Sequence, residues 1–319
     1  MQRPPADSND RQDDRKKRWK FGQNFLVDES VIRQIAEDVP CGPADWVLEI
    51  GPGAGAITRR LLPRCQKLTA IEIDSKWVDH LRKHPEWGNM EVIQADATRI
   101  DVEDVILRSA PGPGSKPFVV GNLPYNRAAP ILFRFLPFIH RFKAMNIMVQ
   151  YEVGKRICAK PHSRDFGFLS VFIQNHATAE MLQKIPQDAF RPRPKVLSAT
   201  IRLIPLAAPK TEDPMFLRFV ELAFSQKRKK MSNSLLPFYP KEKVNAALSA
   251  IEVGENARAE DLSVDQFVSV FKTLGPPPGV LPRKANPPDI SGLGVENGED
   301  FEGEESEAEL EAEDDDEDR

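Results

Sequence analysis

The residues of this chain best suited to chemistry are Asn122, Leu123, Pro124 and Tyr125, which directly follow an apolar run at 117–121. Such a run predicts a buried strand, and open α/β sheets bind ligands at the carboxyl ends of their strands. The Asn122 side-chain oxygen and the Leu123 carbonyl can accept both hydrogens of a base's exocyclic amine, while the Tyr125 ring stacks on the base. The alternative is a proline-containing turn capped by Asn, which commonly follows a strand. These residues alone favour neither interpretation.

A glycine-rich turn occurs earlier in the chain. Gly51, Gly53 and Gly55 follow the apolar run 46–50, and the apolar residues of 56–62 then have helical spacing. A strand, a glycine turn and a helix in this order let the backbone approach a ligand closely. The Gly-x-Gly-x-Gly spacing differs from the dinucleotide-binding fingerprint, and no lysine follows as in a triphosphate-binding loop. A plain tight turn is the alternative.

Acidic residues stand at the ends of the next two predicted strands, 68–73 and 90–95. Glu72 lies about 20 residues after Gly51, where an acid can bind both ribose hydroxyls of a nucleoside cofactor. Asp96 can accept a hydrogen bond from an adenine amine. Either acid alone could equally be a solvated strand-end residue or a helix cap. Together they predict an adenosine pocket, and S-adenosylmethionine is the cofactor that fits it.

Taken together, the glycine turn at 51–55 and the segment 122–126 make the chain resemble the ribosomal RNA adenine dimethyltransferases. The resemblance extends over roughly residues 18–275. The motifs that carry the resemblance are Lys-Phe-Gly-Gln-Asn-Phe-Leu-Val-Asp at 20–28, the run 49–55 with Glu72 and Asp96, the run 122–126, and Phe-Arg-Pro-Arg-Pro-Lys-Val at 190–196 with Ser198-Ala199. A basic segment at 223–230 resembles the family's C-terminal segment. The resemblance implies an α/β fold: a Rossmann-like, seven-stranded S-adenosylmethionine-dependent methyltransferase sheet with a small C-terminal helical domain.

The resemblance also implies roles for individual residues. The expected cofactor-binding residues are Asn24, Leu26, Gly51, Gly53, Glu72, Asp96 and Asn122. The expected catalytic residues are Asn122, Leu123, Pro124, Tyr125 and Phe190. In this scheme Phe190 is the second aromatic wall, opposite Tyr125, around a flipped adenine. The expected RNA-binding residues are Arg191, Arg193, Lys195, Lys227, Arg228 and Lys229.

Within the family, the Gly51-Pro52-Gly53 form and the Phe190 motif favour the branch that modifies small-subunit rRNA. That branch dimethylates the exocyclic amines of two adjacent adenines in the 3′-terminal hairpin loop, so we expect this activity, linked to small-subunit maturation. The expected partner is small-subunit rRNA in a pre-ribosomal particle. The alternatives are a large-subunit methyltransferase of the antibiotic-resistance type and a ribosome-assembly or transcription-factor-like binding protein. DNA or small-molecule methylation is less favoured, because DNA amino-methyltransferases usually have proline where this chain has Leu123.

The expected chemistry depends on alignment rather than on a strong base. An adenine amine is a weak nucleophile, and two acceptors would aim its lone pair at the methyl group. Extruding the base costs a few kcal/mol, and stacking between two rings returns about 1–3 kcal/mol. We expect no metal ion, since His80 and His84 have no nearby acid to complete a metal motif.

The net charge of −4 conceals a strong asymmetry. Residues 296–319 contain fifteen acids and one base, which leaves 43 basic and 33 acidic residues, a net +10, in 1–295. A basic folded part suits a nucleic-acid partner. The acidic tail has too few apolar residues to fold alone. It is expected to serve solubility or to be a species-specific addition, and a sharper hypothesis is that it competes with RNA for the basic face.

The predicted organisation has four parts. These are a disordered basic and polar extension at 1–18, a methyltransferase domain at 19–205, a helical RNA-binding domain at 206–275, and a Pro-rich linker with a disordered acidic tail at 276–319. Helices are expected from Asp213 and Pro214 onward, at 241–251 and at 263–274. No apolar run approaches the roughly 18–20 residues of a membrane span. Three cysteines without a Cys-x-x-Cys pair fit a reducing compartment, so we expect the protein in the cytoplasm. We also expect a monomer.

Overall fold

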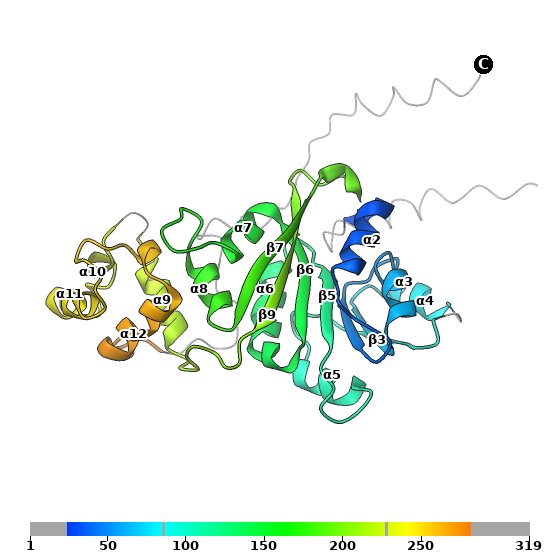
Figure 1. Cartoon of the computed structure of the whole chain (residues 1–319), viewed down its shortest axis with the longest axis horizontal. Coiled ribbons are helices and arrows are strands. Elements are labelled where there is room, and N and C mark those ends of the chain that lie inside the picture. Colours follow the sequence, from blue (N-terminus) through cyan, green and yellow to red (C-terminus); the bar gives the residue numbers. More distant parts are fainter. Residues whose placement is uncertain (1–23, 85–86, 227–228, 282–319) are drawn as a thin grey trace, which may run out of the picture.

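The structure, a computed structural model, describes residues 24–84, 87–226 and 229–281. A twisted sheet occupies the centre, and the C-terminal helices gather at one end of it (Figure 1). The strands are β1 Phe25–Leu26, β2 Trp46–Ile50, β3 Lys67–Glu72, β4 Met90–Gln94, β5 Phe118–Asn122, β6 Ala144–Gln150, β7 Ala177–Ile185, β8 Phe190–Arg191 and β9 Ser198–Pro205. The α-helices are α2 Glu29–Glu37, α3 Thr58–Leu61, α4 Ser75–Arg82, α5 Val102–Ser109, α6 Ala128–Phe135, α7 Tyr151–Ile157, α8 Phe168–Gln174, α9 Phe216–Ala223, α10 Met231–Ser234, α11 Lys241–Ser249 and α12 Val264–Leu274. Short 3₁₀ helices cover Leu62–Arg64, Leu136–Arg141, Gln187–Ala189 and Ala259–Asp261.

The main sheet has seven strands in the order β4-β3-β2-β5-β6-β9-β7. The first five in this order are parallel, and β9 runs antiparallel between β6 and β7. The carboxyl ends of β2, β3, β4 and β5 therefore lie side by side at one edge. This arrangement confirms the predicted Rossmann-like sheet and explains why residues from four distant motifs meet there.

Helices cover both faces of the sheet, so the central strands are largely apolar, with Glu49 and Glu72 as buried exceptions. All five residues of β2 are buried. Because side chains alternate along a strand, Val47 joins an apolar cluster with Ile32 of α2 and Leu61 of α3. Its neighbour Leu48 joins the cluster on the opposite face, which includes Leu132 of α6. The two clusters hold the ligand-binding edge of the sheet rigid.

The C-terminal helices α9 to α12 pack around phenylalanine rings. The Phe271 ring of α12 lies 5.6 Å from that of Phe216 and 5.5 Å from that of Phe219, centroid to centroid. Phe224 in turn contacts Phe166, near α8, at 6.4 Å. The same apolar cluster thus continues from the sheet region into these helices. The division into domains at 205 and 206 stays a prediction.

The segment between β9 and α9 is attached to the end of α8. Asn175 is buried, its side-chain nitrogen donates to the Thr211 carbonyl at 3.0 Å, and its main-chain carbonyl accepts from the Lys210 nitrogen at 2.9 Å. These bonds fix where the C-terminal helices begin.

Helix boundaries differ from prediction mainly at α9. Asp213 was expected as its N-cap, but the Asp213 carboxylate accepts a hydrogen bond from the Met215 nitrogen at 2.8 Å and closes a turn instead. The helix therefore begins at Phe216. At α12 the prediction was accurate, since Ser263 caps the helix through its hydroxyl. No helix in the described ranges is long and apolar enough to cross a membrane.

Candidate active site

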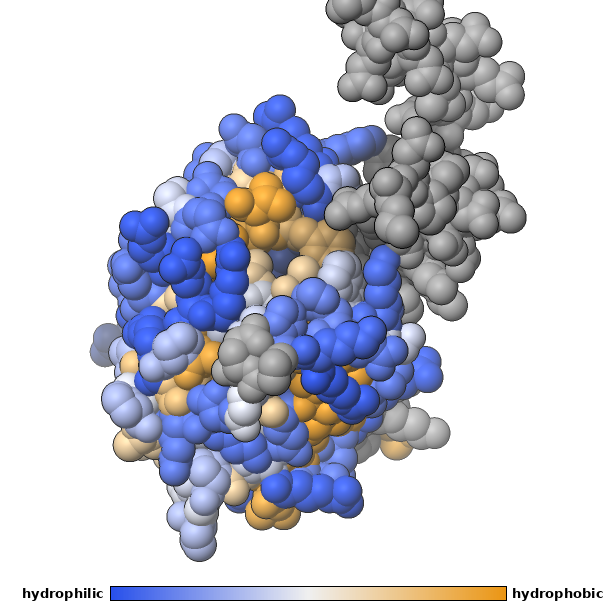
Figure 2. All heavy atoms as spheres, turned by 90° about the vertical axis from the view of Figure 1, so that its right-hand side faces the viewer, coloured by the Kyte–Doolittle hydropathy of each residue, from blue (hydrophilic) through white to orange (hydrophobic). Residues whose placement is uncertain are grey.

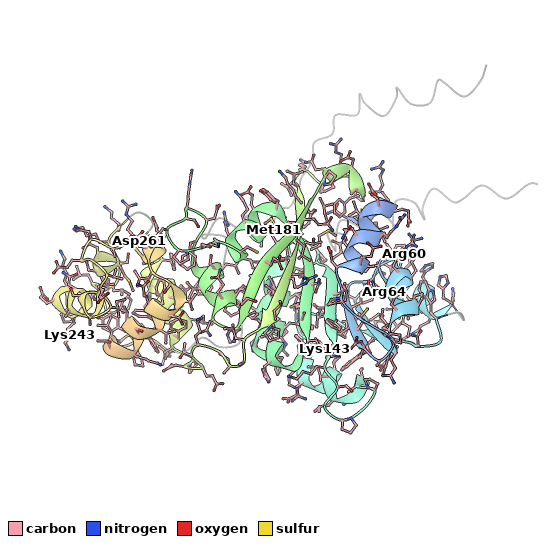
Figure 3. All side chains as sticks on the ribbon, viewed as in Figure 1. Arg60, Arg64, Lys143, Met181, Lys243 and Asp261 are labelled. Carbon is pink, nitrogen blue, oxygen red and sulfur yellow. The ribbon has the colours of Figure 1, made fainter. Side chains whose placement is uncertain are left out.

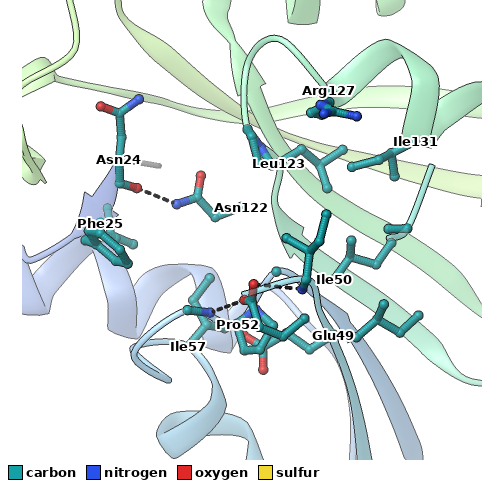
Figure 4. Close-up of a pocket in the computed structure, with 18 of the residues that line it drawn as sticks. Asn24, Phe25, Glu49, Ile50, Pro52, Ile57, Asn122, Leu123, Arg127 and Ile131 are labelled. Carbon is teal, nitrogen blue, oxygen red and sulfur yellow. Dashed lines mark hydrogen bonds between the residues drawn. The ribbon is translucent and has the colours of Figure 1, made fainter. Parts of the chain in front are cut away.

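A pocket opens at the carboxyl edge of β2, β3, β4 and β5 (Figure 4). Its lining comprises Asn24 to Leu26, Glu49 to Ala54, Ala56, Ile57, Ile71 to Ile73, Ala95 to Thr98, Asn122 to Tyr125, Arg127 and Ile131. Every residue predicted to bind the cofactor belongs to this set, and so do four of the five predicted catalytic residues. The fifth, Phe190, does not line the pocket.

The glycine turn forms the floor of the pocket. Gly53 and Gly55 have positive φ angles of 54° and 81°, a region that residues with a Cβ rarely adopt. A Cβ on Gly55 would come within 2.8 Å of the Trp87 ring, and one on Gly53 within 3.1 Å of the Phe25 ring. Glycine at these positions therefore permits both the backbone conformation of the turn and its close packing against Trp87 and Phe25.

The Glu72 carboxylate holds the glycine turn from the end of β3. One oxygen accepts from the Gly53 nitrogen at 3.0 Å, and the other accepts from the nitrogens of Ile73 and Asp74 at 2.9 Å each. Burial raises the pKa of Glu72, although these three donors oppose the shift. The carboxylate thus has a structural role besides any contact with a ligand.

Glu49, at the end of β2, is a second buried acid in the pocket. Burial raises its pKa to about 7, against the opposing hydrogen bond from the Thr58 hydroxyl at 2.7 Å and with a contribution from the nearby Glu72 carboxylate. In the sequence Glu49 stands within a motif that by itself implies no role for it. Its burial, which follows from the helix coverage of β2, could not be deduced from the motif.

Asp96 follows β4 at the far side of the pocket. One carboxylate oxygen accepts from the Thr98 nitrogen at 2.9 Å and from the Thr98 hydroxyl at 2.7 Å. The other oxygen lies 3.8 Å from a guanidinium nitrogen of Arg127 and 4.0 Å from one of Arg99. Burial alone would raise the pKa of Asp96, but the Thr98 bonds and the two arginines lower it. An ionised oxygen is therefore left to accept from a ligand amine.

Asn122 ends β5 and is oriented by the N-terminal part of the chain. Its side-chain nitrogen donates to the Asn24 main-chain carbonyl at 3.0 Å (Figure 4). Because the nitrogen is committed to Asn24, the amide oxygen is directed to the opposite side. The Leu123 nitrogen donates to the Met148 carbonyl at 3.2 Å, which fixes the turn on β6. Among the described residues, none donates a hydrogen bond to the Leu123 carbonyl.

The Tyr125 ring is half-buried at the pocket, and its hydroxyl shares a 2.6 Å hydrogen bond with the Ser198 hydroxyl. Ser198 is fully buried at the first position of β9. In the sequence Ser198 stands out only as part of a motif. No pattern in the sequence predicts this contact.

The structure places Phe190 away from the pocket. Strands β1 and β8 form a two-residue antiparallel ladder that pairs Leu26 with Phe190 and Phe25 with Arg191. Because adjacent strand residues point to opposite sides, Phe190 turns inward with no exposed surface, and Arg191 turns outward. The Phe190 ring belongs to the apolar cluster that contains Ile32 and Ile185. In this structure the ring does not face Tyr125, and its role as a second wall stays a prediction.

The predicted RNA-binding residues that the structure describes are exposed. Arg191 ends β8, Arg193 and Lys195 lie in the loop between β8 and β9, and Lys229 precedes α10. Lys227 and Arg228 lie outside the described residues. Further arginines that the sequence analysis did not consider, Arg60 and Arg64, lie beside α2 (Figure 3). Figure 2 shows that hydrophilic residues dominate this side of the molecule.

The predicted helix-surface histidines belong to a row of rings that begins at the pocket. Phe25 contacts Trp77 at 5.2 Å, Trp77 contacts His80 at 5.7 Å, and His80 contacts His84 at 4.9 Å. His84 stacks on Trp87 at 4.1 Å. Within the described ranges no group of three or more His, Cys, Asp or Glu side chains could hold a metal ion. His80 on α4 and His84 just after it thus take part in ring contacts that extend to Trp87.

Comparisons with known proteins agree with this geometry. A family model described as "Ribosomal RNA adenine dimethylase" matches residues 14–275. The ribosomal RNA small subunit methyltransferase A of Desulfitobacterium hafniense is 39% identical over 258 residues, which are 80% of this chain and 91% of the relative. The protein of the same name from Leptothrix cholodnii is 36% identical over 269 residues, covering 84% and 96%.

Solved structures are similar over the same region. The crystal structure of the 23S rRNA methyltransferase ErmE has a TM-score of 0.61 and 30% identity, covering 79% of this chain and 99% of that one. A dimethyladenosine transferase from Plasmodium falciparum has a TM-score of 0.67 at 22% identity, covering 79% and 98%. At that identity the second likeness concerns the fold alone.

Proposed function

The chain belongs to the ribosomal RNA adenine dimethylase family, and from this premise we propose that it dimethylates two adjacent adenines in the 3′-terminal hairpin loop of small-subunit rRNA. The methyl donor is S-adenosylmethionine, and the acceptors are the exocyclic amines. The observation that carries the proposal is the orientation of Asn122, whose nitrogen is tied to Asn24 so that its oxygen can accept from an amine.

The residues around the pocket suit an adenosyl cofactor. The free oxygen of Asp96 can accept from the adenine amine, and Ile73 and Ala97 offer apolar surface for the ring. The Glu72 oxygens already accept three backbone hydrogen bonds, but two carboxylate oxygens can accept about four. One further hydrogen bond, from a ribose hydroxyl, can therefore still form there. When bound, S-adenosylmethionine supplies an electrophilic methyl group.

The protein's own contribution to transfer is geometric. The Asn122 oxygen and the Leu123 carbonyl accept the two amine hydrogens, which draws the nitrogen toward tetrahedral geometry and directs its lone pair. Tyr125 stacks on the base and holds the plane of the ring. The extra proton passes to solvent after transfer, so no general base is required.

Several features favour small-subunit rRNA as the substrate. The relatives at 36–39% identity are named small-subunit enzymes, whereas the large-subunit enzyme ErmE is 30% identical. Exposed basic side chains lie on the segment that leads into β9, namely Arg191, Arg193 and Lys195. A further one, Lys229, lies in the C-terminal helical region. We assign these residues to phosphate contacts with rRNA in a pre-ribosomal particle, bound by a monomer.

The test uses the full chain with radiolabelled S-adenosylmethionine and two substrates, immature small subunits and large subunits, both from cells lacking the corresponding methylation. Labelled bases are mapped by reverse-transcription stops. We expect label at two adjacent adenines in the 3′-terminal hairpin of the small subunit. Label confined to the large subunit would replace this proposal with the ErmE-like activity. No label on either particle would contradict methylation of rRNA altogether.

A further inference from the structure

The structure links the pocket to a buried side chain that does not line it. Tyr125 lies in the connection between β5 and α6, and its hydroxyl lies 2.6 Å from the Ser198 hydroxyl. Ser198 has no exposed surface and stands at the start of β9, whereas Tyr125 is half-buried at the pocket. We infer that Ser198 is a positioning residue, which holds the Tyr125 ring at the angle needed to stack on the target base. This inference rests on the proposed function.

The Ser198 backbone is held between two strands. On one side Ser198 pairs with Gln150 of β6, and on the other it pairs with Ile185 of β7. A side chain there has a backbone held by two neighbouring strands. Tyr125, by contrast, lies outside any strand or helix, so its ring can turn unless another contact stops it. The hydrogen bond transfers the rigidity of β9 to the ring.

The tyrosine hydroxyl is suited to this anchoring and unsuited to proton transfer. Burial raises the pKa of Tyr125, and the Ser198 hydrogen bond only partly opposes that shift. The phenol therefore stays protonated near neutral pH and cannot serve as a base. A phenylalanine at 125 would offer the same stacking face without the anchor, so the hydroxyl has a purpose separate from stacking.

Ser198 also connects the base pocket to the predicted RNA loop. It closes the segment that begins with β8 and carries Arg191, Arg193 and Lys195. At the same end of the sheet, the Tyr151 nitrogen donates to the Leu197 carbonyl at 2.9 Å, next to Ser198. The proposed phosphate-binding residues and the Tyr125 ring are thus connected through the short segment from β8 to Ser198.

The test compares Ser198→Ala, Tyr125→Phe and the double variant in the full chain. Single-turnover methyl transfer to small-subunit particles gives the rate. An RNA hairpin with 2-aminopurine at the target position reports stacking, because a stacked ring quenches its fluorescence. Each single variant should slow transfer about three- to tenfold, as expected for one lost hydrogen bond, and should brighten the fluorescence. The double variant should be no slower than either single variant, because both remove the same bond.

A matched control separates positioning from general stability. Ser170 is likewise fully buried, and its hydroxyl donates to the Arg156 carbonyl at 2.5 Å, but it does not line the pocket. Ser170→Ala should lower the melting temperature without changing the fluorescence. Binding of S-adenosylhomocysteine, measured by calorimetry, should stay within twofold of wild type in every variant.

Two results would overturn the inference while leaving the proposed function intact. One is a wild-type rate and fluorescence for Ser198→Ala and Tyr125→Phe. The other is losses that multiply in the double variant. If Ser198→Ala fails to fold, Tyr125→Phe removes the same bond and decides the matter by its own rate and fluorescence. Failure of the proposed function is recognised separately, by wild-type protein that methylates no small-subunit adenine.

Discussion

Asn122 and Asn24, 98 positions apart in the chain, are joined by a 3.0 Å hydrogen bond from the Asn122 side chain to the Asn24 main-chain carbonyl. An amide can present either its oxygen or its nitrogen to a ligand, and this bond selects the oxygen. Since the Asn24 contact is made by backbone, it does not depend on the Asn24 side chain. The segment that leads into β1 therefore prepares the site for an amine donor.

Replacing Asn122 with alanine should reduce single-turnover methyl transfer by about 10²–10³-fold, the usual effect of removing one fixed polar group from a reacting centre. Cofactor affinity, measured by calorimetry, should fall much less, because Glu72 and Asp96 remain. Asn126→Ala is the matched control, since Asn126 is exposed and does not line the pocket. Transfer by Asn122→Ala at a near wild-type rate would contradict the amine-binding role.

Glu49 should make stability depend on pH. Its folded pKa of about 7 lies above the ordinary value of 4.5, so the protein binds this proton more tightly when folded. The stabilisation is fully present below pH 4.5 and is lost as pH rises through 7. Thermal melts from pH 5 to pH 8 should therefore show a larger decline for wild type than for Glu49→Gln. Parallel curves for the two proteins would mean that ionisation of Glu49 does not lower the stability of the fold.

Gly53→Ala should weaken cofactor binding at least tenfold, because the new Cβ would crowd the Phe25 ring and disturb the turn that Glu72 holds. Gly114→Ala is the control for backbone strain alone. Gly114 also has a positive φ, 74°, but a Cβ there would meet nothing within 4 Å. Both variants should lose roughly 1–2 kcal/mol of stability, the cost of a left-handed residue. Equal cofactor affinity in the two would show that crowding at Gly53 is unimportant.

Phe190→Leu distinguishes a core residue from a stacking wall. The ring has no exposed surface here, and leucine retains most of its apolar volume. From this structure we expect a small loss of stability and nearly unchanged transfer. A large loss of transfer with an unchanged melting temperature would instead support the second aromatic wall predicted from the sequence, formed after RNA binds.

Arg193→Ala should weaken rRNA binding and reduce the slope of log affinity against log salt by about 0.7–0.9, the value for one phosphate contact. Lys243→Ala is the control, because Lys243 is exposed on α11 and is assigned no RNA contact (Figure 3). Binding is measured by filter retention between low and physiological salt. An unchanged slope for Arg193→Ala would remove this residue from the RNA contact surface.

The sequence predicted the parts of the site that lie within continuous motifs. Runs of apolar residues located β2, β3, β4 and β5, and the residues after them met at one edge because parallel strands end together. It could not predict pairings between distant short segments. The ladder of β1 with β8 has two residues in each strand and carries no periodicity, yet it decides that Phe190 is buried.

Other parts of the site depend on tertiary packing. Arg127, after β5, lines the pocket and lies 3.8 Å from Asp96, after β4, and the sequence offers no motif for that pair. The Ser198 contact with Tyr125 depends on where β9 inserts between β6 and β7, an order fixed by the whole sheet.

The ladder of β1 with β8 has a thermodynamic consequence. Leu26 lines the cofactor pocket, and its partner in the ladder, Phe190, begins the segment that carries the proposed RNA-binding arginines. If a ligand at one strand displaces the other through this ladder, binding at the two sites is coupled. By thermodynamic reciprocity, if bound cofactor raises the affinity for rRNA, bound rRNA must raise the affinity for the cofactor by the same factor. The conversion of the cofactor to its demethylated product would then loosen both together, so that release of the modified ribosomal particle is coupled to completion of the reaction.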